Sequence, residues 1–341
     1  MENSIVFITE SGTQIGYGHL YRSIALAKEF LNNGYEVEFN VSDKVAEELV
    51  LQHLEKINFI TFNSLEKNIS KYKYVFLDVF KSSWINYKKL ISDSQSQVQF
   101  VSIIDNAFLD YSLDTDFVFT IGFQNYQLKL DTFKDKDERR IKKYSGNKLF
   151  VFREEFENIE LIEIKKEVKN IFVSMGGSDP YRLTEMIARS CKHLKQDLTF
   201  NYVLGAGFED DRVTDLFQIA KTPNFEINIH KNIQNMASLM IKNDAAIING
   251  GNTRFELALL GIPFASISFN ETQNNIANNL ERHGIGKNIG DYNNLEISEI
   301  HNYIKFKLLP YNCRKKIADG FKGKFNNQGA QNIFELLHSS N

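Results

Sequence analysis

Short apolar runs alternate along the chain with longer segments whose apolar residues recur at helical spacing. In the first half, these runs predict buried strands, because they are rich in Val, Ile and Phe and are bounded by polar residues or glycine. The predicted strands cover residues 4–8, 36–41, 59–62, 73–80, 99–105 and 116–122. Helical spacing marks residues 20–34 and 44–56, and Gly34 is expected to close the first of these helices.

The same alternation restarts at residue 170 and continues through the second half. The predicted strands lie at 170–177, 198–205, 225–230, 245–250 and 263–269, and the predicted helices at 181–194, 233–243, 252–261 and 272–284. Strands that alternate with helices predict a parallel sheet whose crossovers are helical. The fold class is therefore α/β, with two parallel-sheet halves of similar size.

A stretch between the two halves breaks this pattern. Residues 128–148 are charged and have no clear buried face, so we expect a surface excursion there. Residues 157–169 are polar enough to cross between domains. We therefore place an N-terminal domain at 1–155 and a C-terminal domain with a helical tail at 165–341. Ligands bind beyond the carboxyl ends of parallel strands, so a small-molecule site is expected in an inter-domain cleft.

Composition narrows the function classes. The 341 residues are 43% hydrophobic and 24% charged, as in globular proteins, and 40 Lys and Arg against 43 Asp and Glu give no electrostatic reason to expect nucleic acid. Cys191 and Cys313 have neither metal-ligand nor redox spacing, which suits reduced thiols. No window approaches the roughly 18 consecutive apolar residues of a membrane-spanning helix. We expect a cytoplasmic enzyme or binding protein.

The loop after the first strand contains Gly16, Tyr17, Gly18, His19 and Arg22. A dinucleotide-binding G-x-G-x-x-G is not met, and no acidic residue ends the second strand to hold a ribose, so a nicotinamide or flavin site is not supported. The glycines allow a ligand close to the backbone, and an imidazole at a helix start can act as general base or acid near neutral pH. A capping or core histidine is the alternative interpretation.

A loop in the second half pairs two glycines with a helix start. Gly176, Gly177 and Ser178 precede Asp179 and Pro180. A helix cap explains Asp179 and Pro180 fully, whereas the paired glycines suit a backbone brought close to an anion. Both interpretations of this loop stay open.

A second such loop holds Gly250, Gly251, Asn252, Thr253 and Glu256. Backbone amides from Gly251 to Thr253 could hold a phosphate or diphosphate, and Glu256 could accept two ribose hydroxyls. The alternative is a capping box, in which Asn252 or Thr253 caps the helix and Glu256 is its partner.

Other polar residues carry weaker signals. Asp78 and Asp105 each end a buried strand, and each is interpreted either as a ligand contact or as a cap. The sequence has no H-E-x-x-H, D-x-D or Cys/His grouping and no serine nucleophile elbow. We therefore predict neither a metal nor a cofactor.

Together these segments resemble a known group of proteins. The segments are QIGYGHLYRSIALA, VSMGGSDP, NMASLMIKNDAAIINGGNTRFELALLGIP, TQNNIANNLERHG and NNQGAQNI, in family order over nearly the whole chain. They are similar to the UDP-sugar hydrolase of the pseudaminic acid pathway and to the related spore-coat polysaccharide proteins. These in turn are similar to the lipid II N-acetylglucosaminyltransferase. The resemblance implies a GT-B-like fold of two Rossmann-like parallel-sheet domains that face an inter-domain cleft, with the nucleotide held mainly by the second.

The resemblance also implies roles for single residues. His19 would activate water for attack on the anomeric carbon, with loss of UDP, inversion and no required metal. The amides around Gly251, Asn252 and Thr253 would hold the diphosphate and Glu256 the ribose, with Gly250 beside them. Substrate contacts are assigned to Gly16, Tyr17, Gly18, Arg22, Gly176, Gly177, Ser178, Asp179, Asn270, Thr272 and Gln273.

The chain departs from this family mainly in its first half. Ile8 and Glu10 stand where the family resembled here has Arg and Asp. Asp78-Val79-Phe80 stands where it has Asp-His-Tyr, and Thr272-Gln273 where it has Asn-Gln. The residues expected to recognise the sugar have therefore changed, while His19 and the nucleotide loop are intact.

Three functions follow as hypotheses. The leading one is a hydrolase that releases UDP from a UDP-sugar, an amino-deoxy sugar by resemblance, in bacterial surface-glycan or nonulosonic acid biosynthesis. The second is an inverting GT-B glycosyltransferase that gives the sugar to a hydroxyl acceptor. The third is a catalytically silent nucleotide-sugar-binding protein. In each, a nucleotide-sugar is the partner.

Overall fold

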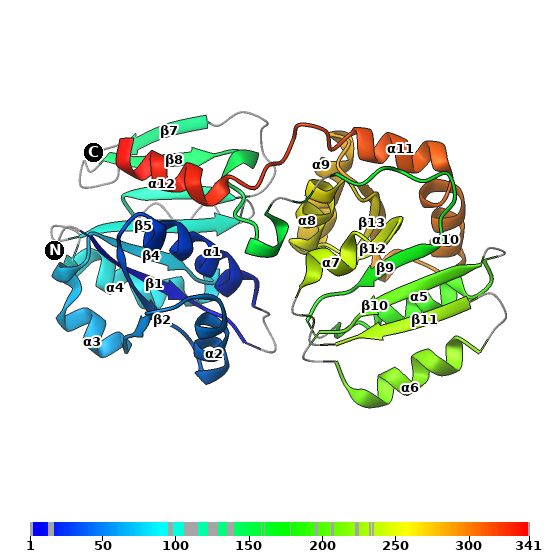
Figure 1. The fold of residues 1–341 in the computed structure, drawn as a ribbon, viewed down its shortest axis with the longest axis horizontal. Coiled ribbons are helices and arrows are strands. Elements are labelled where there is room, and N and C mark those ends of the chain that lie inside the picture. The colour runs from blue at the N-terminus through cyan, green and yellow to red at the C-terminus, as the bar shows by residue number, and fades with distance from the viewer. Residues whose placement is uncertain are drawn as a thin grey trace. The chain divides into compact units, whose positions relative to one another are not determined.

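The computed structural model describes residues 3–12, 17–94, 98–105, 115–121, 129–134, 140–157, 159, 161–177, 179–194, 197–205, 208–221, 225–231, 233 and 235–339. The chain forms two compact units, each built on its own sheet (Figure 1). The first unit comprises Met1–Glu154 and Asn326–Asn341, and the second comprises Glu155–Phe325.

The first unit contains an eight-stranded sheet in the order β3-β2-β1-β4-β5-β6-β8-β7. All its pairings are parallel except that of β7 with β8. Its strands are β1 (Ser4–Thr9), β2 (Glu36–Asn40), β3 (Asn58–Phe59), β4 (Tyr74–Asp78), β5 (Gln99–Asp105), β6 (Phe117–Ile121), β7 (Lys129–Lys134) and β8 (Arg140–Ser145).

The expected surface excursion at 128–148 is wrong in part, because β7 and β8 lie within it and extend the first sheet. β8 contributes Ile141 to a small core with Val118, and its Tyr144 stacks on Phe119 with ring centroids 5.2 Å apart. Only these two side chains of β8 are hydrophobic, and the charged residues around them hide the strand pattern in the sequence.

Helices cover both faces of this sheet. Successive residues of a strand point to opposite faces, so Ile5 and Phe7 of β1 join one core, while Val6 and Ile8 join another. The first core includes apolar residues of α1, α2 and α12, and the second includes those of α3 and α4. These helices are α1 (Gly18–Asn32), α2 (Lys44–His53), α3 (Phe62–Lys67), α4 (Trp84–Ser94) and α12 (Gly329–Ser339).

The position of α12 corrects the expected domain composition, which placed the helical tail in the second domain. Ile333 and Leu337 of α12 are fully buried in the core that contains Phe30. At the end of the helix, Nε2 of His338 lies 2.7 Å from the hydroxyl oxygen of Tyr35. The last helix therefore completes the first unit, because its apolar stripe covers one face of the first sheet (Figure 1).

The second unit contains a six-stranded, wholly parallel sheet in the order β11-β10-β9-β12-β13-β14. Its last strand was not expected, since it has a single apolar residue, Ile289. The strands are β9 (Asn170–Ser174), β10 (Leu198–Val203), β11 (Phe225–His230), β12 (Ala245–Asn249), β13 (Phe264–Ser268) and β14 (Lys287–Asp291). The helices are α5 (Leu183–Cys191), α6 (Asp210–Ile219), α7 (Met236–Met240), α8 (Thr253–Leu260), α9 (Glu271–Arg282), α10 (Ile297–Tyr303) and α11 (Tyr311–Asp319).

Each sheet has one place where the strand order reverses. In the first unit this switch point lies between β1 and β4, and in the second between β9 and β12. Doubly wound sheets bind ligands beyond the carboxyl ends of the strands at such points. The fold therefore directs attention to the loops that follow these four strands. Among the described helices, none has the length and apolar character needed to cross a bilayer.

Candidate functional site

His19 and Asp78 meet across the switch point of the first unit. His19 lies in the first turn of α1, and Asp78 is the last residue of β4. Nδ1 of His19 lies 3.2 Å from Oδ1 of Asp78 and 3.3 Å from its backbone oxygen. Both partner atoms accept hydrogen bonds, so we assign the proton of the neutral ring to Nδ1 and the lone pair to Nε2. Nε2 is therefore the atom that can take up a proton.

Asp78 is fully buried, and its charge is balanced by Arg22. Arg22 Nε donates to Oδ2 of Asp78 over 2.5 Å, and its Nη2 donates to Oδ1. Ser23 Oγ adds a hydrogen bond of 3.3 Å to Oδ2. Arg22 was predicted to contact substrate, but its guanidinium is buried in this bidentate ion pair. The geometry gives Arg22 an internal role, in which it holds the carboxylate that orients His19.

Phe80 and Glu10 complete the surroundings of His19. The ring of Phe80 stacks on the imidazole, with centroids 4.4 Å apart and an interplanar angle of 17°. The backbone N–H of Phe80 donates to Oε2 of Glu10 over 2.8 Å. Burial, together with the charge and hydrogen bond of Glu10, raises the pKa of Tyr87 to about 12. In the sequence these residues stood out only as departures from a family pattern.

In the second unit, Asn249 links the two glycine loops at the switch point. Its Nδ2 donates to the backbone oxygen of Met175 over 3.1 Å, and its Oδ1 accepts from the backbone N–H of Gly251 over 3.2 Å. Gly176 has φ +88°, and a Cβ there would lie 2.7 Å from Nδ2 of Asn249. Asn249 is not among the predicted site residues, although it ends a buried strand directly before a glycine pair.

Two further close approaches pack these loops together. A Cβ on Gly205, which follows β10, would lie 2.1 Å from the backbone oxygen of Gly177. A Cβ on Gly250 would lie 2.8 Å from Oε1 of Gln273. The structure therefore brings together the predicted residues after β9, β12 and β13, and it needs glycine at these contacts.

The N-terminus of α8 is the part of this loop cluster that suits an anion. Asn252 occupies the N-cap position, but its side chain makes no capping hydrogen bond, so a capping box built on Asn252 is ruled out. Among the described residues, the backbone N–H groups of Asn252 and Thr253 have no acceptor, whereas that of Gly251 is taken by Asn249. Glu256, one turn into α8, is only 9% exposed. Two amides and the positive end of a helix are thus available to a phosphate group.

Asp179 serves as an internal cap. Its carboxylate accepts the backbone N–H groups of Leu183 and Thr184, both over 2.9 Å, and pairs with Arg212 over 2.9 Å. Arg212 also binds both carboxylate oxygens of Glu185 over 2.7 Å. Asp179 was predicted to contact substrate, but these buried partners occupy its carboxylate and give it the structural role.

The remaining predicted residues either lie at helix starts or fall outside the described residues. Asn270 Oδ1 caps α9 by accepting the backbone N–H of Gln273 over 2.9 Å, and Gln273 Oε1 accepts from Phe269 N–H over 3.3 Å. In the first unit, Tyr17 stands at the N-cap position of α1 and Gly18 begins that helix. Gly16, Ser178 and the side chains of Asp105 and Thr272 lie outside the described residues.

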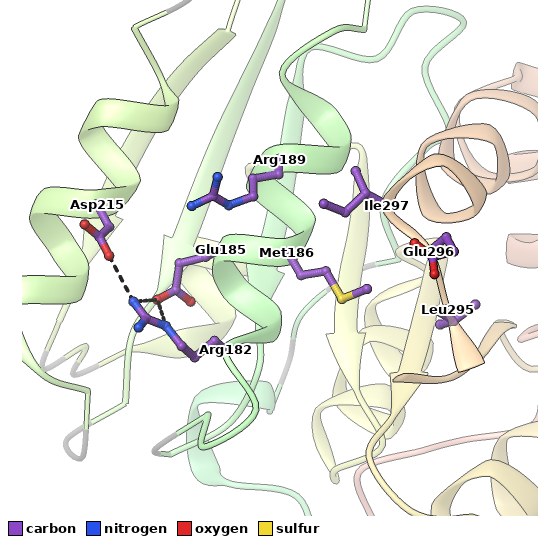
Figure 2. A pocket seen from close by; sticks show the side chains of 8 residues that line it. All are labelled: Arg182, Glu185, Met186, Arg189, Asp215, Leu295, Glu296 and Ile297. Carbon is purple, nitrogen blue, oxygen red and sulfur yellow. Dashed lines mark hydrogen bonds and ion pairs between the residues drawn. The ribbon is translucent and has the colours of Figure 1, made fainter. Parts of the chain in front are cut away.

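A hollow of about 550 Å³ lies along α5 (Figure 2). On one side, Arg182 pairs with Glu185 over 3.1 Å and with Asp215 over 2.9 Å, which neutralises much of the charge there. None of the glycine-loop residues lines it, so it is distinct from the loop cluster. Its lining residues are Arg182, Glu185, Met186, Arg189, Asp215, Leu295, Glu296 and Ile297. Elsewhere in the described chain, no three His, Cys, Asp or Glu side chains are placed to share a metal ion.

Comparison of the sequence with known proteins gives two relatives. The chain is 30% identical to an uncharacterised protein of Methanocaldococcus jannaschii, MJ1062, over 295 residues, which are 79% of this chain and 56% of that protein. It is 29% identical over 129 residues to the spore coat polysaccharide biosynthesis protein SpsG of Bacillus subtilis, which is 37% of each chain. The chain thus spans about half, or less, of the length of these relatives. No protein-family profile matches it.

Comparison of the structure extends over the whole chain. MurG of Acinetobacter baumannii is similar with a TM-score of 0.72 and 15% identity, covering 99% of both chains. Anabaena HepE, solved in complex with UDP and glucose, is similar with a TM-score of 0.60 and 13% identity, covering 99% of this chain and 100% of HepE. The chain therefore has the GT-B fold of glycosyltransferases.

Proposed function

We propose that the chain is an inverting glycosyltransferase that transfers a sugar from a UDP-sugar to a hydroxyl group. The observation that carries this proposal is the oriented imidazole of His19, whose Nδ1 is held by Asp78 while Nε2 is left to accept a proton. This is the arrangement of a general base in acyl and group transfer, in which a buried carboxylate selects the tautomer.

The reaction balances with His19 as the only base. The proton of the acceptor hydroxyl moves to Nε2, and the acceptor oxygen forms a bond to the anomeric carbon. The bond between that carbon and the phosphate oxygen breaks, and UDP leaves with the electron pair. A single displacement inverts the configuration at the anomeric carbon. No step requires a covalent enzyme intermediate.

The second unit supplies the proposed donor site. The diphosphate lies at the N–H groups of Asn252 and Thr253, where the α8 dipole favours negative charge. Glu256 accepts hydrogen bonds from the ribose hydroxyls, and Gln273 contacts the sugar or phosphate. Support comes from HepE, which shares this fold and was solved with UDP and glucose, and from SpsG, whose name refers to polysaccharide biosynthesis.

The test is an assay of UDP release from a panel of UDP-sugars, with and without sugar acceptors. A transferase releases UDP at a rate that depends on the acceptor, and the product carries the new glycosidic bond. Equally fast release in water alone would identify a UDP-sugar hydrolase and overturn the transferase proposal. Absence of both release and any thermal shift with UDP would overturn the nucleotide-sugar proposal altogether.

Asn249→Ala is expected to weaken UDP binding by about tenfold, since it removes both hydrogen bonds that join the glycine loops and leaves the Gly251 N–H unpartnered. Isothermal titration calorimetry with UDP measures this change. Asn228→Ala is the matched control, because Asn228 also bonds through its amide but within the sheet, to Asn201 over 3.3 Å. Equal UDP affinity in the Asn249 variant and the wild type would show that the amide does not position the donor loop.

A further inference from the structure

The position of Phe80 beside the base is held by its neighbours on the chain. Val79 before it is 4% exposed in the core between the sheet and α4, and Trp84, which begins α4, is 2% exposed. Between these anchors, the backbone N–H of Phe80 binds Glu10 over 2.8 Å, and its backbone oxygen accepts the N–H of Ser83 over 3.0 Å. The ring is therefore held in a defined place, stacked on one face of His19.

Among the described residues, the carboxylates beside His19 and Phe80 are bonded to other groups of the protein. Asp78 accepts from Arg22 and Ser23 and holds Nδ1 of His19. Glu10 Oε2 accepts the Phe80 amide. On the stacked face, the nearest side chain is an aromatic hydrocarbon ring, which offers no hydrogen bond in its plane.

A bound water needs two to four polar partners to be held in place. Nε2 of His19 supplies one partner, and Phe80 adds none on its side. An acceptor sugar does not depend on such partners, because the rest of the molecule holds its hydroxyl in position. Water and an acceptor hydroxyl therefore differ at His19. Water lacks the polar partners that would hold it there, whereas the rest of the acceptor molecule holds its hydroxyl in position.

We propose that Phe80 is a specificity-determining residue that keeps water from replacing the acceptor at His19. This inference rests on the proposed function, since it concerns which hydroxyl gives its proton to Nε2. Hydrolysis would use the same proton transfer and the same loss of UDP, with water oxygen bonding to the anomeric carbon. Phe80 lowers the rate of that side reaction because its apolar ring, stacked on the imidazole, gives a water at Nε2 no hydrogen-bonding partner on that side.

Two substitutions with opposite chemistry test the proposal. Phe80→Tyr adds a hydroxyl that can hold a water, whereas Phe80→Leu keeps an apolar cover. We expect Phe80→Tyr to raise the ratio of hydrolysis to transfer by about tenfold, the effect of one hydrogen bond on the attacking water. Phe80→Leu should leave this ratio within about twofold of the wild type. An unchanged ratio in Phe80→Tyr, or an equal rise in both variants, would overturn the proposal.

An arm without substrate separates this inference from the proposed function. Diethyl pyrocarbonate modifies accessible imidazoles, and peptide mass spectrometry reports His19 and the exposed His193 separately. His19 should react more slowly than His193, and Phe80→Ala should accelerate His19 alone by about tenfold, while Phe80→Leu leaves it slow. If His19 reacts as fast as His193 in the wild type and Phe80→Ala changes nothing, Phe80 does not shield the base, whatever the donor assay shows. Failure of the donor assay with this shielding intact would instead count against the transferase.

Discussion

His19→Ala is expected to lower kcat for UDP-sugar turnover by about 10²- to 10⁴-fold, the usual contribution of a general base. Among the described residues, the Asp78 carboxylate next to His19 cannot replace it as the base, because it is committed to Arg22 and Ser23. The affinity for UDP should stay unchanged, because the proposed donor loops belong to the second unit. Steady-state UDP release and calorimetry with UDP measure the two quantities.

A variant of Asp78 and a control variant of His193 extend this test. Asp78→Asn keeps a side chain of the same shape but removes the charge that selects the tautomer of His19, so kcat should also fall. This variant leaves the buried Arg22 without its carboxylate, so its fold must be checked by circular dichroism. His193→Ala, which replaces an exposed histidine, is the control and should retain wild-type turnover. Full turnover in His19→Ala would show that His19 is not the base.

Arg212→Ala is expected to lower the free energy of unfolding by about 3–5 kcal/mol, the loss seen when one partner of a buried ion pair is removed. Arg212 is 5% exposed and pairs with two carboxylates, Asp179 and Glu185, that are themselves 3% and 4% exposed. Its loss leaves Asp179 buried without its cation and leaves Glu185 with only the exposed Arg182, and it also removes the bond from Nη1 to the backbone oxygen of Asp179. Urea denaturation followed by circular dichroism measures the change.

Arg182→Ala is the matched control for this prediction. Arg182 bonds the same Glu185 and also Asp215, but its side chain is 56% exposed. Its removal should therefore lower the free energy of unfolding by less than about 1 kcal/mol. Burial alone would raise the pKa of Glu185, but the hydrogen bonds from Arg212 hold it below its ordinary value. This stabilisation is present above the unfolded carboxyl pKa and is lost as the pH falls through the lowered value. Equal losses in the two variants would show that burial does not govern the network.

The central strands of both sheets could be predicted from the sequence for a physical reason. Strands of a parallel sheet are buried on both faces, so they appear as continuous apolar runs such as Ser4–Thr9 and Ala245–Asn249. The edge strands β7 and β14 lack this signature. So does β8, which lies between β6 and β7 but has only two hydrophobic residues, and all three strands were missed for that reason. The pattern of α12 predicts a helix, but periodicity alone does not tell which of two sheets its apolar stripe covers.

The candidate site, too, could be predicted from the sequence only in part. His19 and the glycine loops could be selected because helix starts and glycine pairs are local signals. Their partners could not be identified from the sequence. Asp78 bonds to His19, 59 positions before it, and Asn249 bonds to Met175, 74 positions before it. Such contacts depend on how strands pair in the folded sheet. Asp179 and Arg22 show the opposite case. Both were predicted to contact substrate, but buried partners within the protein occupy their side chains.

Because α12 follows the second unit along the chain but packs in the first, the first unit is completed after the second during synthesis. The ribosome completes the second unit, Glu155–Phe325, before it produces the helix that covers the core around Phe30. Until that helix emerges, the unit that carries His19 keeps an uncovered apolar face, which chaperones recognise and aggregation exploits. The unit with the proposed donor site is thus complete on the nascent chain first. A chain that terminates before α12 would lack the helix that completes the core of the unit with His19, so the proposed activity requires translation through α12.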